Sequence, residues 1–178
     1  MNSRTLEQGV GLIEILISLL VIAVGLLGMA ALQGRAQQSE FESYQRAQAL
    51  ILADDMANRL RANRVARACY DLAAKDIDSI GTGATYTASG CNTAADADLA
   101  AWHNSLLGAA EVAGEQNVGA MIGARGCIRT DAAGDFVVSV AWQGMTETVA
   151  PADTCGQGAY GTEKYRRVVS TVVSFATL

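Results

Sequence analysis

The sequence predicts an α+β fold in which one long N-terminal helix packs on a small antiparallel β-sheet. Three patterns support this fold. The run from Ile15 to Leu32 contains no charged residue, the segment from Arg35 to Arg67 contains no proline or glycine, and short apolar stretches with alternating polarity follow Gly119. The first two patterns favour a helix and the third favours strands.

The composition limits the classes of function. The chain has 178 residues, which suffices for one compact domain plus a long helix. Its formal net charge is −5 and only 6% of its residues are aromatic, whereas nucleic-acid-binding proteins usually carry a basic stripe and stacking platforms. The single histidine, His103, excludes a site built on several histidines. We therefore expect no enzymatic activity, no cofactor, no metal site and no nucleic-acid partner.

Residues 1–9 form a short polar leader that ends in Gly9. This leader is too short and too polar for an ordinary secretory signal peptide, and no A-x-A-like site follows the apolar run cleanly. A cut before the apolar run would leave that run in the mature chain.

The apolar run from Ile15 to Leu32 is long enough to cross a membrane, since 18 helical residues span about 27 Å. Arg4 precedes it, so the N-terminus is expected in the cytoplasm. Glu14 lies at its mouth, where a charge costs about 2.5–3.5 kcal/mol or more, which favours a functional role over a snorkelling interfacial residue. Gly25 and Gly28 favour either close helix–helix packing or a segment that unwinds.

The string Gly9-Val10-Gly11-Leu12-Ile13-Glu14, with the apolar helix that follows, resembles the class III signal of type IV pilins and pseudopilins, and PilV-type minor pilins in particular. The resemblance implies a type IV pilin fold, cleavage by a prepilin peptidase between Gly9 and Val10, and N-methylation of Val10. It also implies that Glu14 guides assembly by pairing with the N-terminal amine of a neighbouring subunit, because a carboxylate and an ammonium that both face lipid gain by pairing. The sequence departs from the family at Val10, where phenylalanine is usual, and near Ala31, where many major pilins carry a proline.

The resemblance divides the chain into three regions. Residues 1–9 are the prepilin leader, residues 10–33 are the membrane-spanning or filament-core half of the helix, and residues 34–178 are a periplasmic head that includes the second half of the helix. The chain is expected in the bacterial inner membrane as a single-pass protein that later joins a surface pilus. The family implies other minor pilins, the major pilin, the prepilin peptidase and a tip adhesin as partners.

The second half of the long helix is expected to pack on the head. Its apolar residues recur at steps of three and four and form one stripe. The stripe consists of Ala49, Leu52, Ala53, Met56 and Leu60.

Four cysteines, Cys69, Cys91, Cys127 and Cys155, follow the apolar run. None lies in a CxxC pair, which argues against zinc-ribbon and thioredoxin-type sites. An even number of separated cysteines beyond a membrane span favours disulfides in an oxidising compartment. Of the three possible pairings we favour Cys69–Cys91 with Cys127–Cys155, because each bond closes a local loop. Each bond is expected to add roughly 3 kcal/mol by restricting the unfolded chain.

A short helix is expected from Asp96 to Gly108. Asp96 or Asp98 is the expected N-cap and Gly108 the stop. One face carries three apolar residues that should be buried against the sheet, and His103 lies on another face as a surface or half-buried residue. The apolar residues are Leu99, Trp102 and Leu106.

The sheet is expected to have three or four strands. One strand ends near Thr130, the segment 131–135 is a hairpin loop, and the segments 136–142 and 165–175 are further strands. Met145–Val149 is expected as a short edge strand, and Gly81-Thr82-Gly83 as a turn.

The string Gly156–Gly161 has the spacing of a dinucleotide-binding motif, but it opens no helix. We expect instead an extended or disordered loop that is tethered by Cys155. The nearby aromatic residues Trp142, Tyr160 and Tyr165 fit either the core or contacts with neighbouring subunits.

Three functions are compatible with these features. The first is a minor pilin that primes type IV pilus assembly, takes part in the tip complex, and supports twitching motility and adhesion. The second is a minor pseudopilin of a type II secretion system, of which some members carry calcium-binding carboxylate clusters that are not evident here. The third is a membrane-anchored periplasmic enzyme, for which the sequence offers one histidine and no nucleophile motif.

Overall fold

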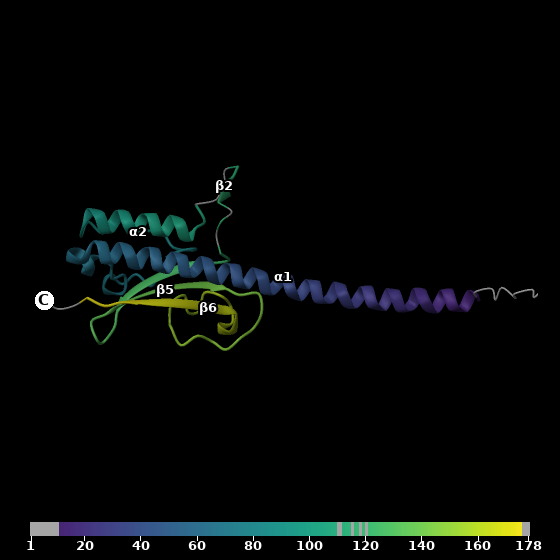
Figure 1. Ribbon diagram of the computed structural model, residues 1–178. Coiled ribbons are helices and arrows are strands. Elements are labelled where there is room, and N and C mark those ends of the chain that lie inside the picture. Colours follow the sequence, from purple (N-terminus) through teal and green to yellow (C-terminus); the bar gives the residue numbers. More distant parts are fainter. Residues whose placement is uncertain (1–10, 110–111, 115, 118, 120, 176–178) are drawn as a thin grey trace, which may run out of the picture. The chain divides into compact units, whose positions relative to one another are not determined.

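The computed structural model describes residues 11–109, 112–114, 116–117, 119 and 121–175. The chain divides into two compact units, residues 1–41 and residues 42–178. Helix α1, Leu12–Ala62, is a single 51-residue helix, in agreement with the predicted long helix (Figure 1). The predicted cut site at Gly9 and Val10 lies outside the described residues.

The second half of α1 packs on the head through the predicted stripe. Ala49, Ala53, Met56 and Leu60 are completely buried and Leu52 is partly buried. Because residues three and four apart share a face of a helix, this stripe forms one continuous contact surface. The prediction for this half of the helix is confirmed.

The sheet contains four antiparallel strands in the order β1-β4-β5-β6. They are β1, Ile80–Gly81; β4, Arg125–Thr130; β5, Phe136–Gln143; and β6, Arg166–Val173. Two further short strands, β2 at Val112–Ala113 and β3 at Gln116–Asn117, pair with each other. A long helix on a small antiparallel sheet is the predicted α+β fold of a type IV pilin, and the fold class is confirmed.

Helix α2, Thr93–Leu106, is the predicted short helix, but its N-cap differs from the prediction. Asn92, and neither Asp96 nor Asp98, caps it, with the Asn92 side chain accepting a hydrogen bond from the Ala95 N–H at 3.0 Å. Gly108 follows the helix with a φ of 78°, so the predicted stop is confirmed.

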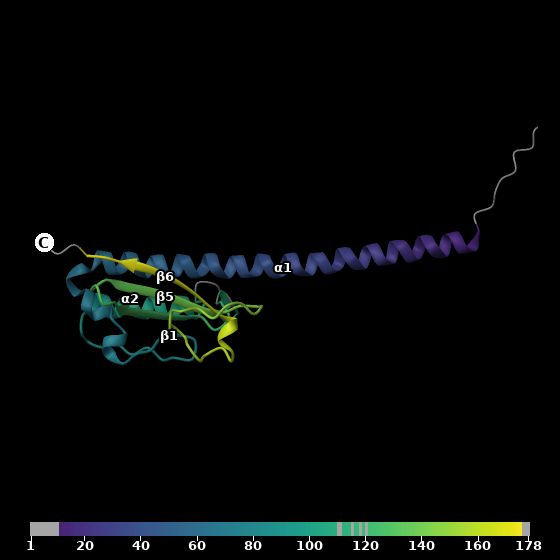
Figure 2. The same ribbon diagram turned by 90° about the horizontal axis from the view of Figure 1, so that it is seen from below.

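The main core lies between α1, α2 and one face of the sheet (Figures 1 and 2). Leu99, Trp102 and Leu106 of α2 are completely buried, as predicted. The Trp102 Nε1–H donates to the carbonyl of Leu52 in α1 at 2.9 Å. A Cβ at Gly126 of β4 would come within 2.5 Å of the Trp102 ring, so this position requires glycine. The tryptophan thus joins both helices to the sheet.

The opposite face of β5 is also buried. Ala141 and Tyr160 pack there around the Cys127–Cys155 disulfide, and Ser139 is fully buried as well. The loop that covers this face consists of successive turns, and the Tyr160 hydroxyl donates to the Gly123 carbonyl at 2.8 Å. The prediction of an extended or disordered loop at Gly156–Gly161 is therefore wrong, because Tyr160 and the disulfide anchor this segment on the sheet.

The predicted edge strand at Met145–Val149 is also wrong. The backbone N–H groups of Met145 and Thr146 donate to the Glu42 side chain at 3.0 and 3.1 Å, and the Thr148 N–H donates to the Lys164 carbonyl at 2.9 Å. These donors are bound by a carboxylate and a loop carbonyl, so no strand ladder forms over these residues.

The remaining connections are short 3-10 helices and turns. The 3-10 helices are η1 at Arg64–Tyr70, η2 at Ala73–Lys75 and η3 at Glu163–Tyr165. The predicted hairpin loop at 131–135 is present, with the Asp131 N–H donating to the Asp135 carbonyl at 2.8 Å. The predicted turn at Gly81–Gly83 is also present, and both glycines have positive φ.

Candidate functional site

The N-terminal part of α1 is the first candidate site. The helix begins at Leu12, and the Glu14 N–H donates to the Gly11 carbonyl at 2.9 Å. Glu14 therefore lies in the first helical turn, where a carboxylate interacts favourably with the positive end of the helix dipole. Its side chain is exposed. The structure thus presents one carboxylate at the start of the apolar run.

The hydroxyl of Ser18, one turn after Glu14, is satisfied inside the helix. The Ser18 Oγ donates to the Glu14 carbonyl at 2.7 Å, one turn earlier. Because this bond satisfies the Ser18 hydroxyl, the hydroxyl needs no water partner, and a helix in lipid has no water beside it. The backbone here is therefore compatible with a dry environment, and the Glu14 carboxylate is the charge that calls for a partner.

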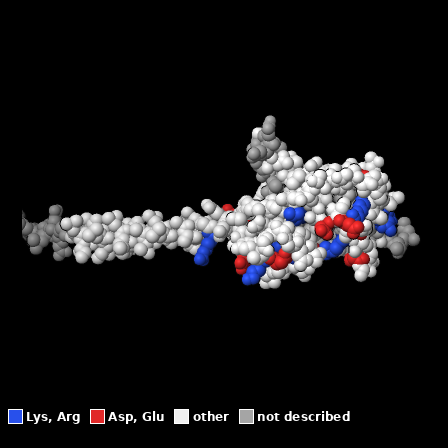
Figure 3. All heavy atoms as spheres, turned by 180° about the vertical axis from the view of Figure 1, so that it is seen from behind, with Lys and Arg blue, Asp and Glu red and all other residues white. Residues whose placement is uncertain are grey.

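A broad apolar surface follows Glu14. The helix carries no charge from Ile15 to Gly34, and the same stretch shows as uncharged surface in Figure 3. The helix is long and apolar enough to cross a membrane, and none of its apolar window is buried. Soluble proteins rarely expose so large an apolar surface in water, which indicates a membrane or helix partner. The exposed large residues are Ile15, Leu16, Ile17, Leu19, Leu20, Val21, Ile22, Val24, Leu26, Leu27, Met29 and Leu32.

Gly25 and Gly28 lie within this surface and are both helical. A Cβ added at either position would meet no atom within 4 Å, so neither glycine is required by contacts inside the chain. Three residues apart, they share one side of the helix, where small residues allow the backbone of a second helix to approach closely. The structure has a helix at the place where unwinding was the other interpretation.

Within the head, Glu42 of α1 holds the loop that leads from β5 to β6. Its Oε1 accepts from the Thr146 hydroxyl at 3.0 Å, from the two backbone donors described above, and from Arg167 of β6 at 3.4 Å. Burial raises the pKa of Glu42, but the Thr146 hydrogen bond, the Arg167 charge and the backbone N–H groups together lower it below its ordinary value. The sequence did not predict these contacts of Glu42. Met145 and Thr146 follow Glu42 by more than one hundred positions, and no local pattern links residues so far apart.

A second carboxylate, Asp153, lies within this same loop, residues 144–165, which is called the C-terminal loop, and anchors it to the sheet. Arg129 donates to its two oxygens at 3.1 and 3.0 Å, and the hydroxyls of Ser139 and Ser170 donate at 2.8 and 2.9 Å. Burial raises the pKa of Asp153, yet these donors and the Cys155 N–H lower it well below its ordinary range. Asp153 therefore joins three strands of the sheet to the loop that carries Cys155.

Both disulfides join neighbours in the sequence. Cys69 bonds to Cys91 and Cys127 bonds to Cys155, with Cα–Cα distances of 5.7 and 5.8 Å. These are the sequential pairs that the sequence favours. The first bond ties η1 to the segment before α2, and the second ties β4 to the C-terminal loop.

His103 lies on α2 and is half-buried, in agreement with the prediction of a surface or half-buried histidine. Its Nδ1 accepts a hydrogen bond from the Gly81 N–H at 3.0 Å, which places the ring proton of the neutral form on Nε2. Burial lowers the pKa of His103. The ring thus fixes the start of the turn after β1, which is a structural role.

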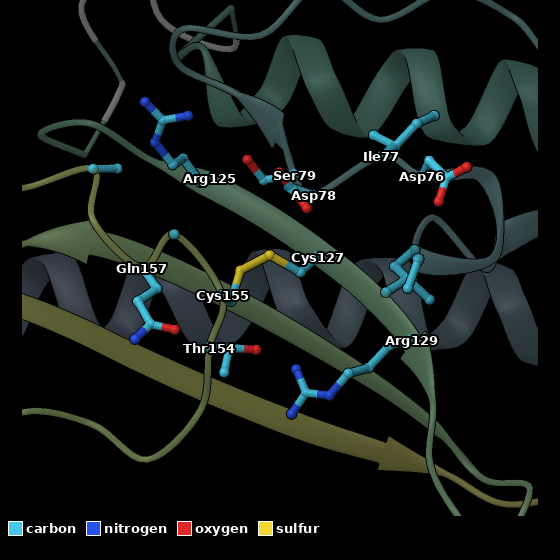
Figure 4. Close-up of a pocket in the computed structure, with 14 residues that line it drawn as sticks. Asp76, Ile77, Asp78, Ser79, Arg125, Cys127, Arg129, Thr154, Cys155 and Gln157 are labelled. Atoms are coloured by element: carbon cyan, nitrogen blue, oxygen red, sulfur yellow. A yellow bond between two sulfur atoms is a disulfide. The ribbon is translucent and has the colours of Figure 1, made fainter.

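A cavity of about 500 Å³ lies beside the Cys127–Cys155 disulfide (Figure 4). Asp76 and Asp78 come from the segment after η2, while Thr154 and Gln157 come from the C-terminal loop. The Arg129 guanidinium at its rim is already bound to Asp153. Over the part of the chain that the structure describes, no group of three or more His, Cys, Asp or Glu side chains has the arrangement of a metal site.

The predicted aromatic contacts divide between core and surface. Trp142 and Tyr160 are only 3% and 7% exposed and belong to the core. Tyr165 is half-buried at the start of β6. The two buried residues are therefore unavailable for contact with a neighbouring subunit.

Part of this chain matches a known protein family. The family described as Tt1218-like, type IV pilin Tt1218, matches residues 31–102, which is less than half of the 178 residues. The matched segment begins within α1 and ends at Trp102 of α2, so it excludes the leader, Glu14 and strands β4 to β6. It therefore supports a place in the type IV pilin superfamily independently of the N-terminal signal. No curated protein and no solved structure matches the chain.

The match supports a pilin role in general. The type IV pilins are a structural and non-enzymatic family, and a membrane-anchoring N-terminal helix fits incorporation into a pilus. The apolar half of α1, with Glu14 in its first turn, is therefore the candidate functional site.

Proposed function

We propose that the chain is a minor pilin that helps to prime type IV pilus assembly, takes part in the pilus tip complex, and thereby supports twitching motility and adhesion. The observation that carries the proposal is the N-terminal half of α1. It exposes an apolar surface without charge from Ile15 to Gly34, preceded by the single carboxylate of Glu14 in the first helical turn. The exposed apolar surface of such a helix is favourable in lipid or among other apolar helices and unfavourable in water.

Processing by a prepilin peptidase is the first step of the proposed function. A cut between Gly9 and Val10 would leave the whole of α1, which begins at Leu12, on the mature chain. N-methylation of Val10 would keep the positive charge of the new terminus. The mature chain then places its own ammonium four residues before Glu14.

Glu14 is proposed to pair with the N-terminal ammonium of a neighbouring subunit. In the apolar surroundings of the membrane an unpaired carboxylate costs several kcal/mol, so each new subunit gains when its carboxylate meets an ammonium. Gly25 and Gly28 would allow the helices of neighbours to approach closely. These features support the proposal that the apolar half of α1 acts in assembly.

Replacement of Glu14 tests this role. The Glu14→Val variant should insert in the membrane normally but reach surface pili at least about tenfold less than wild type, since 1.4 kcal/mol corresponds to a factor of ten. The measurement is the ratio of the chain in sheared pili to the chain in membranes. Glu40→Val, a matched change at an exposed position of the same helix, should leave this ratio unchanged. Equal incorporation of the two variants would contradict the pairing.

The proposed placement has residues 10–33 in the inner membrane and the head, residues 34–178, in the periplasm. Both disulfides lie in the head, which suits an oxidising compartment. The proposed partners are other minor pilins, the major pilin and a tip adhesin, with the prepilin peptidase as processing enzyme.

Deletion of the gene separates a pilus role from a type II secretion role. The proposal predicts loss of surface pili with normal levels of secreted proteins, measured by electron microscopy and by protein analysis of the medium. Pseudopilins share this type of N-terminal signal, so loss of secretion with normal pili would instead assign the chain to a type II secretion system. Complementation with the intact gene is the control.

A further inference from the structure

Strand β6 forms an open edge of the sheet. It pairs with β5 alone, and it ends the strand order. The bond from the Gly144 N–H to the Tyr165 carbonyl, at 2.8 Å, fixes the alternation of backbone groups along β6. The backbone groups of Val169 and Thr171 therefore face β5, whereas those of Val168, Ser170 and Val172 face outward.

The outward groups of β6 are free over the described part of the chain. No hydrogen bond among the described residues reaches the backbone N–H or C=O of Val168, Ser170 or Val172. Ser170 is exposed, and 53% of the Val172 surface is accessible. This edge therefore offers a row of accessible donors and acceptors to a further strand.

Beyond its first two residues, β6 lacks the features that usually protect such an edge. Arg166 and Arg167, at its start, are paired with Glu163 and Glu42. Residues 168–173 read Val-Val-Ser-Thr-Val-Val, without charge, proline or glycine. Exposed edges of soluble proteins generally carry a lysine, a proline or a bulge that prevents pairing with another chain. Uncharged six-residue segments of high β-propensity pair readily when exposed. The composition indicates that this edge is covered in the assembled state.

Helix α1 runs beside the open edge of β6. The Thr171 hydroxyl donates to Asp54 of α1 at 3.3 Å, and Figure 2 shows α1 running alongside β6. Leu50 lies one turn before Asp54 on the same side of the helix and is 42% exposed. A strand added to β6 would thus meet Leu50 on one face of the sheet and Val172 on the other.

We propose that β6 is the docking site for an extended, uncharged strand of another pilin subunit, which continues the sheet by main-chain hydrogen bonds. This mode of recognition takes its affinity from backbone bonds and its specificity from side-chain contacts on both faces. The inference rests on the proposed function, because a pilin partner follows from a shared pilus.

The direction of α1 disfavours antiparallel pairing of β6 with the β6 strand of a second copy. Glu42 contacts Arg167 at the start of β6, and Asp54 contacts Thr171 further along, so α1 runs parallel to β6 within the head. Antiparallel pairing of two β6 strands would therefore make the two α1 helices antiparallel. Within the head, the residues of α1 nearest to the membrane half would then lie at opposite ends of the two copies, which does not fit the proposed anchoring of both copies in one membrane.

Site-specific photo-cross-linking tests the proposal in the producing bacterium. The full-length chain carries p-benzoylphenylalanine in place of Val172, and a matched control carries it in place of Val149, which is 90% exposed outside the edge. The cross-linked residues are identified by mass spectrometry. We expect the Val172 probe to react with one contiguous segment of another chain that has a pilin signal, at least about tenfold more than the control.

A proline at the edge provides the second measurement. The Val172 N–H faces outward, so Val172→Pro removes no bond to β5 but deprives an added strand of one partner. Val172→Pro should reduce co-isolation of the cross-linked partner with the full-length chain about tenfold or more, whereas Val149→Pro should not. Circular dichroism of both variants should show wild-type melting.

Three outcomes would overturn the inference: a Val172-to-Val172 link between two copies, no excess of Val172 links over Val149 links, or unchanged co-isolation with Val172→Pro. If pili are lost on gene deletion while the Val172 links are absent, only the edge proposal fails. If pili and secretion are both normal on deletion, the proposed function fails, and the cross-links still report whether a strand covers β6.

Discussion

Asp153 anchors the C-terminal loop to the sheet through several hydrogen bonds. It accepts hydrogen bonds from Arg129, Ser139, Ser170 and the Cys155 backbone, so it joins β4, β5 and β6 to the loop. Its side chain is 15% exposed, and its donors would be left without their acceptor if it were removed. When buried groups lose a charged partner, the free energy of unfolding falls by several kcal/mol.

We expect Asp153→Asn to lower the free energy of unfolding by about 2–3 kcal/mol at pH 7. The pKa of Asp153 is lowered in the folded state, so its contribution is fully present above the unfolded pKa of about 3.9 and is lost as the pH falls through the lower folded pKa. The difference between variant and wild type should therefore shrink in strongly acidic solution.

The measurement is urea unfolding of the full-length chain in detergent micelles, at neutral and at acidic pH. Asp78→Asn, at an exposed carboxylate, is the control and should change stability by less than about 0.5 kcal/mol. Equal stability of Asp153→Asn and wild type at pH 7 would show that the donors around Asp153 find other partners.

Asp96 shows why the sequence pattern predicted the wrong N-cap for α2. Either aspartate could cap α2 by its position, but Asn92 lies earlier and is an equally good cap. Asp96 is instead only 8% exposed and accepts bonds from Ser89, Gly90 and Tyr86. These donors lie in the segment that the Cys69–Cys91 bond holds in place, so its role depends on tertiary structure.

Among the elements, α1 has two surfaces that its sequence distinguishes clearly. Its first half is apolar on all sides, which a buried or membrane helix requires, and its second half carries a single stripe, which a surface helix requires. The stripe that includes Met56 and Leu60 is buried as predicted. Period and hydrophobicity are local properties, so the two surfaces of this helix could be predicted, whereas its continuity through Gly25 and Gly28 could not.

Strand β5 was harder to predict. The alternation that places Phe136 and Val138 on one face correctly predicts a strand. Ser139 and Ala141 lie on the other face, and they are buried as well. The cover on that second face is the loop with Cys155 and Tyr160, which follows β5 at a distance in the sequence. A strand pattern does not reveal what covers a face, so the position of this loop could not be predicted.

The two disulfides are expected to stabilise the head to a similar extent. They close segments of 22 and 28 residues, and each should contribute roughly 3 kcal/mol by restricting the unfolded chain. Mass spectrometry of a non-reduced digest should find Cys69 linked to Cys91 and Cys127 linked to Cys155. A Cys69–Cys127 peptide would contradict this pairing.

Double replacement by serine tests the contribution of each bond. The Cys127→Ser, Cys155→Ser variant should unfold at lower urea concentration than wild type, and so should the variant that lacks Cys69 and Cys91. The first variant should also loosen the loop with Tyr160, which packs on that bond. Unchanged unfolding of the first variant would show that Asp153 and Tyr160 hold the loop without the disulfide.

At the scale of the whole molecule, the fold class and the candidate site followed from separate parts of the chain. The signal around Gly9 and Glu14 predicts membrane insertion and assembly, while the family match at residues 31–102 rests on the second half of α1 and the segment to α2. The open edge of β6 was not predictable, because the free backbone groups depend on which strands become neighbours. Pairing order is a property of the complete fold.

The mature chain is proposed to be a processed pilus subunit. The mass of its N-terminal peptide, after recovery from sheared surface pili, tests this proposal. We expect a peptide that begins at Val10 with one N-methyl group. A chain in the pili that retains residues 1–9, or a chain that is abundant in membranes but missing from normal pili, would contradict the proposal.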